Sequence, residues 1–207
     1  MASLFTFEDL KELVRLTGEL LKKEDQIIRE DFHKNRAYAT SGQIPGIANT
    51  NLQDERYYQR LTWRALLPTY WYSARLEYQG FDIALFRDGE TSPSAIGQMK
   101  KCLGTGFEGV SEANCDRENL AKQPYQSCAH FLLIFTAAGF TPLGESCLDA
   151  FVGEALDRME CSVNRRWLYR FNTPLDKDGH GTLTDGEFGV LGVLLKDHSL
   201  GPTQSSG

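Results

Sequence analysis

The sequence predicts an α/β fold in which a mixed central sheet is flanked by helices, with one extra helix at the N-terminus. Three observations support this prediction. Apolar residues recur at helical spacing near the N-terminus, and strand-like segments then alternate with helix-like segments along the rest of the chain. The length of 207 residues is sufficient for one sizeable hydrophobic core.

Residues 1–35 carry the extra helix. Thr6 to Asp9 resemble a capping box, which favours a helix start at this point. Apolar residues follow at near-helical spacing: Leu10, Leu13, Val14, Leu20, Leu21 and Ile28. This apolar side most simply packs on the rest of the domain. The alternative is a seam through which the chain forms a homodimer or binds a protein partner.

Residues 53–198 are expected to form the α/β domain, after a Gly- and Pro-containing loop at 36–52. The first half of this domain reads as one helix that Pro68 stops, a hairpin around Gln79-Gly80, and a third strand that ends in lysines. These elements are expected at about 54–67, 71–78, 81–86 and 95–101.

The second half of the domain centres on the most hydrophobic strand of the chain, CAHFLLIFTAA at 128–138. A short helix is expected before it at 116–123, and an amphipathic helix after it at 148–161. A strand at 167–171 follows, and 188–195 is either a closing strand or a short helix. Residues 199–207 read as a disordered tail.

Composition and charge bound the class of protein. The net charge is −6 and the sequence pI is about 5.3, which gives no global attraction to a polyanion. The five cysteines never form a CxxC pair, which argues against a zinc site and a disulfide framework. With no signal-peptide pattern and no apolar run long enough to span a bilayer, a cytoplasmic protein is expected.

The residues that carry potential chemistry lie on the second and third predicted strands. Asp82 is on the second strand, and Gln98 and Lys100 share one face of the third because side chains alternate along a strand. If the strands pair, an acid, an amide oxygen and an amine converge. Asp82 and Gln98 could then hold Mg²⁺ or Mn²⁺ while Lys100 orients a water, and Glu55 on the preceding helix could add an acid.

The stretch FDIALFRDGETSPSAIGQMKK, with a helix before it and DRENLAKQ and HFLLIF after it, resembles the PD-(D/E)xK, restriction-endonuclease-like nuclease superfamily. That family carries an Asp on one strand, ExK or QxK on the next, and in many members a Glu on the preceding helix. The resemblance implies a restriction-endonuclease-like sandwich and a metal-dependent nuclease, a hydrolase that binds DNA and cleaves its phosphodiester bonds. It assigns catalysis to Asp82, Gln98, Lys100 and Glu55.

Two positions depart from the family pattern. Gln98 replaces the usual acid, as in the QxK variant, and this removes one charge from the metal site. Phe81 precedes Asp82 where the family name places a proline. The alternative is therefore a catalytically inactive protein with the same fold, acting as a binding or inhibitory partner.

A second motif lies near the C-terminus. Residues 176–187, DKDGHGTLTDGE, match the twelve-residue EF-hand loop, with Asp176, Asp178 and Glu187 at its first, third and last positions. Pro174 and a strand-like alternation before the loop favour a turn between two strands instead. The third hypothesis is a calcium-binding module that uses this loop.

Overall fold

The computed structural model describes residues 5–34, 55–68, 73–87, 89–103, 128–158, 165–176 and 183–196. The described residues form an α/β structure built on one mixed six-stranded sheet, as the sequence predicted. The elements in chain order are α1 (Phe7–Lys34), α2 (Glu55–Leu66), β1 (Ser73–Tyr78), β2 (Phe81–Phe86), β3 (Ala95–Leu103), β4 (Ala129–Gly139), α4 (Cys147–Arg158), β5 (Arg166–Asp176) and β6 (Leu183–Lys196).

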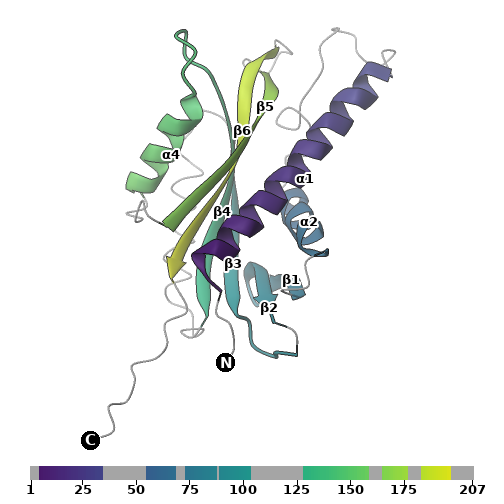
Figure 1. Cartoon of the computed structure of the whole chain (residues 1–207), viewed down its shortest axis with the longest axis vertical. Coiled ribbons are helices and arrows are strands. Elements are labelled where there is room, and N and C mark those ends of the chain that lie inside the picture. Colours follow the sequence, from purple (N-terminus) through teal and green to yellow (C-terminus); the bar gives the residue numbers. More distant parts are fainter. Residues whose placement is uncertain are drawn as a thin grey trace, which may run out of the picture.

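The sheet has the strand order β1-β2-β3-β4-β6-β5 (Figure 1). β3 and β4 run parallel, whereas the other neighbouring strands are antiparallel. A parallel pair needs a crossover connection, and here the intervening chain is 104–127. The expected helix at 116–123, the loop at 36–52 and the tail at 199–207 lie outside the described residues.

Helices cover both faces of the sheet. Figure 1 shows α1 and α2 on one side of the sheet and α4 on the other. Two apolar clusters correspond to these faces: one joins α1 and α2 to residues such as Leu133 and Val190, and the other joins α4 to residues such as Ile134 and Leu191. β4 and β6 contribute to both clusters because alternate side chains of a strand point to opposite faces.

The N-terminal helix belongs to this core. The Thr6 N–H donates to Asp9 Oδ2 at 2.7 Å and the Asp9 N–H donates to Thr6 Oγ1 at 3.3 Å, which makes the expected capping box. Leu10, Val14 and Leu21 are completely buried against the sheet and α2. These apolar residues of α1 therefore pack on their own domain, whereas Ile27 on the same helix is 51% exposed. A homodimer or protein partner through this helix stays a prediction.

The C-terminal part of the described chain consists of two strands, β5 and β6. Residues 188–195 lie inside β6, which is a strand and not a short helix. β5 and β6 pair antiparallel from Arg166↔Val193 to Asp176↔Leu183, so they form a hairpin. No helix in the described part of the chain is both long and apolar enough to cross a membrane.

Candidate functional site

The hairpin between β1 and β2 interrupts the regular alternation of side chains at Asp82. Leu76 pairs with Ile83 and Tyr78 pairs with Phe81, but Glu77 and Asp82 are not paired. Glu77 has a φ of 51°, in the left-handed region that non-glycine residues seldom adopt. The hairpin is therefore distorted opposite Asp82.

The distortion decides which way the side chains of β2 point. Phe81 belongs to the apolar cluster on the α4 face, whereas Ile83, two residues later, belongs to the cluster on the α1/α2 face. Regular alternation would place these two side chains on the same face. With the alternation broken between them, Asp82 turns toward the α2 side of the sheet.

Gln59 and Met99 both donate hydrogen bonds to the Asp82 carboxylate. Gln59 on α2 donates its Nε2 hydrogen to Asp82 Oδ1 at 2.9 Å, and the Met99 N–H donates to Asp82 Oδ2 at 2.6 Å. Gln59 is only 7% exposed, so the first of these hydrogen bonds lies in the α2–sheet interface. The carboxylate thus completes the edge of the β2–β3 ladder, where the backbone pairing has already ended at Ile83↔Gly97.

Gln98 and Lys100 share a face of β3, as expected, but it is not the face that Asp82 occupies. Ile96 and Cys102, on the same alternation, both lie in the α4-side cluster. The Gln98 amide donates to the Gly80 carbonyl oxygen at 3.0 Å. The structure therefore does not bring Asp82, Gln98 and Lys100 together on one face.

The face that Asp82 does occupy carries a different triplet. Met99 is buried in the α1/α2-side cluster, and alternation places Lys101 on the same side. The pattern facing Asp82 is thus Met99-Lys100-Lys101, shifted by one residue from Gln98-Met99-Lys100. A shift of one residue moves every side chain to the opposite face of a strand. Alternation read from the sequence alone therefore placed Gln98 and Lys100, and not Met99 and Lys101, on the face of Asp82.

These groups do not fit Mg²⁺ or Mn²⁺. Such cations prefer several oxygen ligands, whereas the described side chains here provide one carboxylate with hydrogen bonds on both oxygens and the Gln59 amide. Within the described residues no group of three or more His, Cys, Asp or Glu side chains could hold a metal ion. Glu55 is the first residue of α2, and its side chain lies outside the described part. The catalytic roles of Asp82, Gln98, Lys100 and Glu55 stay predictions.

The EF-hand-like loop lies between two strands. Asp176 pairs with Leu183 at the end of the β5–β6 hairpin, so the helices that flank an EF-hand loop are not present here. Asp178 lies outside the described residues. Glu187 is four residues into β6, opposite Asn172, and its side chain contacts groups away from the turn. Calcium binding by Asp176, Asp178 and Glu187 stays a prediction that this architecture does not favour.

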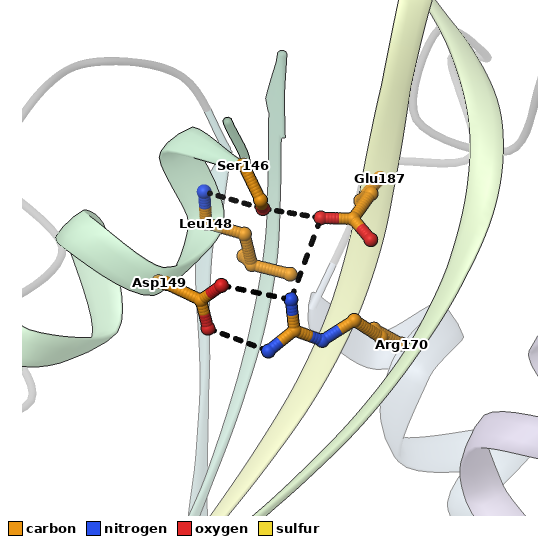
Figure 2. A network of polar contacts seen from close by, with 5 residues as sticks. All are labelled: Ser146, Leu148, Asp149, Arg170 and Glu187. Carbon is orange, nitrogen blue, oxygen red and sulfur yellow. Dashed lines mark hydrogen bonds and ion pairs between the residues drawn. The ribbon is translucent and has the colours of Figure 1, made fainter. Parts of the chain in front are cut away.

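Glu187 belongs to a polar network at the start of α4 (Figure 2). Ser146 donates its hydroxyl hydrogen to Glu187 Oε2, and the Leu148 N–H donates to Ser146 Oγ at 3.2 Å. Arg170 on β5 contacts Asp149 through two hydrogen bonds of 2.5 and 3.0 Å, and its Nη1 lies 3.7 Å from Glu187 Oε2. The hydrogen bond from Arg170 lowers the pKa of Asp149.

This network connects α4 to the β5–β6 hairpin. Ser146 acts as the N-cap of α4, and its presence immediately before an amphipathic run is the signal that sequence reasoning did not use. Glu187 is 8% exposed, and Ser146 and Arg170 compensate its burial. The contacts of all four side chains fall within the fold, so the network is structural in its geometry.

No protein-family model, curated protein or solved structure matches this chain. The assignment of function therefore rests on the geometry described above.

Proposed function

We propose that this chain is a catalytically inactive protein of the PD-(D/E)xK type, whose fold serves to bind a macromolecular partner. The observation that carries the proposal is the environment of Asp82. Both of its oxygens accept hydrogen bonds from the protein, and the β3 side chain beside it is Met99 where the family has an acid or an amide. On the side of α2, the described group at this carboxylate is the amide of Gln59.

The topology supports the choice of fold type. A helix, α2, precedes the antiparallel strands β1, β2 and β3, and β4 then joins the sheet parallel to β3. This is the element order that the resemblance to the restriction-endonuclease-like superfamily implied. Asp82 on β2 and the lysines at the end of β3 lie on the strands where the resemblance expects the family motif, which supports a scaffold of this type with few ligands for a metal.

One observation favours the alternative, an active Mg²⁺-dependent nuclease acting on DNA. Asp82 faces the helix before the sheet, and Lys101 follows on the same side of β3, so an acid and an amine of the family pattern are both retained. Against it, the one carboxylate seen at this place among the described side chains is hydrogen-bonded and provides little charge to polarise a phosphate, and the overall charge of −6 opposes a polyanion.

Incubation of the protein with plasmid DNA and Mg²⁺ or Mn²⁺ tests the two proposals. We expect no nicking, and the thermal unfolding midpoint should not respond to Mn²⁺. Nicking that disappears in Asp82→Ala would overturn the inactive assignment.

A gain-of-site variant sharpens this test. Met99→Glu combined with Gln59→Glu places two more carboxylates beside Asp82, and Mn²⁺ should then raise the unfolding midpoint of the variant but not that of the wild type. Gln98→Glu is the matched control, because it adds an acid on the opposite face of β3. If Mn²⁺ raised the unfolding midpoint of Gln98→Glu and not that of the double variant, the face of β3 beside Asp82 would be the one that carries Gln98.

A further inference from the structure

A hollow lies where the β5–β6 hairpin meets α1 and the turn that follows β4. Its volume is about 500 Å³, which is in the range of sites that bind small molecules. The described walls come from three parts of the chain: Arg29 from α1, Asp185 from β6 and Phe140 from the turn after β4. A smaller hollow of about 300 Å³ adjoins it, since Arg29 and Asn172 line both. We call the larger one the Arg29 hollow.

A buried carboxylate holds Arg29 at the wall of this hollow. Asp25, one turn earlier on α1, is 2% exposed, and its Oδ1 accepts a hydrogen bond of 2.7 Å from Thr173 Oγ1 on β5. The other oxygen, Oδ2, lies 3.6 Å from Arg29 Nη1. The Arg29 side chain is nevertheless 44% exposed, and a guanidinium has several N–H donors, so donors remain for a ligand. Asp25 is therefore a positioning residue for the cation of the Arg29 hollow.

A second wall of the Arg29 hollow carries the opposite charge. Asp185 is exposed, and its side chain makes no hydrogen bond or ion pair within the part of the chain that the structure describes. Arg29 and Asp185 line the same hollow, yet among the described contacts they form no ion pair with each other. A hollow with a cation and an anion that do not pair with each other suits a ligand that carries both charges.

The third wall is apolar, and its backbone is well fixed. Phe140 is 38% exposed and forms a β-bridge with Ser146, and within this turn the Thr141 N–H donates to the Glu145 carbonyl oxygen at 2.8 Å. Gly144, which also lines the hollow, has a φ of 82°, in the left-handed region that favours glycine. The turn therefore holds an accessible aromatic ring against which an apolar part of a ligand can pack.

We propose that the Arg29 hollow binds a free α-amino acid with a large apolar side chain. Arg29 binds the carboxylate of the ligand, Asp185 binds its ammonium group, and its side chain packs on Phe140. The planar guanidinium matches a carboxylate through two parallel hydrogen bonds, which orients the ligand as well as holding it. This site goes beyond the proposed function, which concerns Asp82 and a macromolecular partner, and it does not depend on that function.

The charges of the hollow favour a zwitterion over a simple ion. A simple anion bound at Arg29 would be repelled by the carboxylates of Asp25 and Asp185, and a simple cation bound at Asp185 would be repelled by Arg29. An uncharged apolar ligand would remove water from both charged groups without replacing it by a partner. An amino acid has no net charge, so the overall charge of −6 neither attracts nor repels it.

Thermal unfolding of the full chain in the presence of L-phenylalanine tests the inference. Up to about 10 mM L-phenylalanine should raise the unfolding midpoint in a saturable way, because a ligand that binds only the folded state stabilises it. N-acetyl-L-phenylalanine lacks the cation and L-phenylalaninamide lacks the carboxylate, so neither should give a comparable rise. Glycine keeps both charges but has no side chain for Phe140, and it should bind about tenfold more weakly or less.

Variants of the two charged walls locate the ligand. Asp185→Asn changes an exposed side chain, so the fold should persist, and calorimetric titration should show L-phenylalanine binding weakened by about tenfold or more. Arg29→Gln should weaken binding by a similar factor, and circular dichroism checks that this variant folds although Asp25 loses its cation. Asp157→Asn makes the same charge change as Asp185→Asn at an exposed position of α4. This matched control should alter the affinity by less than about twofold.

Three outcomes would overturn the assignment of the Arg29 hollow. They are no response to L-phenylalanine, an equal response to its two derivatives, or binding that Asp185→Asn weakens no more than Asp157→Asn does. None of them bears on Asp82, which the plasmid assay tests separately. Nicking of DNA by a protein that also binds L-phenylalanine through Asp185 would refute the inactive assignment and leave the Arg29 hollow standing.

Discussion

Asp82 and Glu187 are two partly or fully buried carboxylates on opposite sides of the same sheet, and the protein compensates them differently. Among the described contacts, Asp82 faces α2 and accepts hydrogen bonds from a side-chain amide and a backbone N–H, both of which are neutral. Glu187 lies beside the start of α4, where it accepts a hydroxyl hydrogen from Ser146 and has the Arg170 guanidinium 3.7 Å away. Neutral donors fix the position of a carboxylate, whereas a cation also offsets its charge.

The largest effect is expected at the carboxylate with neutral donors. Asp82→Ala leaves the Met99 N–H and the Gln59 amide without acceptors in the α2–sheet interface, and each unsatisfied buried group is costly. The free energy of unfolding should fall by about 3 kcal/mol in urea titrations. Asp82→Asn, which retains an acceptor oxygen, should recover part of this loss. Equal stability of wild type and Asp82→Ala would show that the two hydrogen bonds contribute nothing to the fold.

A smaller loss is expected on the other side of the sheet. Arg170→Met removes the cation beside Glu187, but the Arg170 side chain is 38% exposed, so water partly replaces it. The unfolding free energy should fall by about 2 kcal/mol. Arg170→Met combined with Glu187→Gln should lose less than Arg170→Met alone, because no uncompensated charge then remains. An additive loss in this double-mutant cycle would contradict the pairing.

The strained hairpin gives a change of opposite sign. Glu77 adopts a φ of 51°, a conformation that costs energy for a residue with a Cβ and none for glycine. Glu77→Gly should raise the unfolding free energy by up to about 1 kcal/mol, since the ion pair of Glu77 with Arg56 is exposed and 3.9 Å long. Tyr78→Gly, the neighbouring position without positive φ, should destabilise and serves as the contrast.

The fold was more predictable than the site, for reasons visible at these residues. A long apolar run such as 128–138 predicts a central strand whatever its exact register. Thr6 with Asp9 predicts a helix start, because the two residues form local hydrogen bonds there. The face on which Asp82 lies depends instead on one irregularity at Glu77, and no spacing rule reveals it. Regular alternation therefore predicted Gln98 and Lys100 beside Asp82, whereas the residue of β3 that contacts Asp82 is Met99.

The Glu187 network was missed for a related reason. Its members come from the start of α4, from β5 and from β6, and Ser146 and Glu187 are 41 residues apart in the chain. The EF-hand-like spacing indicated a local role for Glu187 at the end of the loop, whereas its contacts are set by strand pairing over the whole hairpin. Tertiary contacts of this kind depend on which strands pair. That pairing is decided by all the strands of the sheet together and not by any local sequence motif.

The smallest expected effect is the pH dependence of stability at Asp149, the second carboxylate that Arg170 contacts beside Glu187. The hydrogen bond from Arg170 lowers the pKa of Asp149, so the folded state binds fewer protons there than the unfolded state does. This stabilisation is present above the ordinary carboxyl pKa of about 3.9 and is lost as the pH falls through the lowered value. Asp149 is 61% exposed, so the contribution should be below about 1 kcal/mol. Acid titration of stability in wild type and Arg170→Met isolates it: the two curves should converge at low pH, and curves that stay parallel would show that Asp149 titrates independently of Arg170.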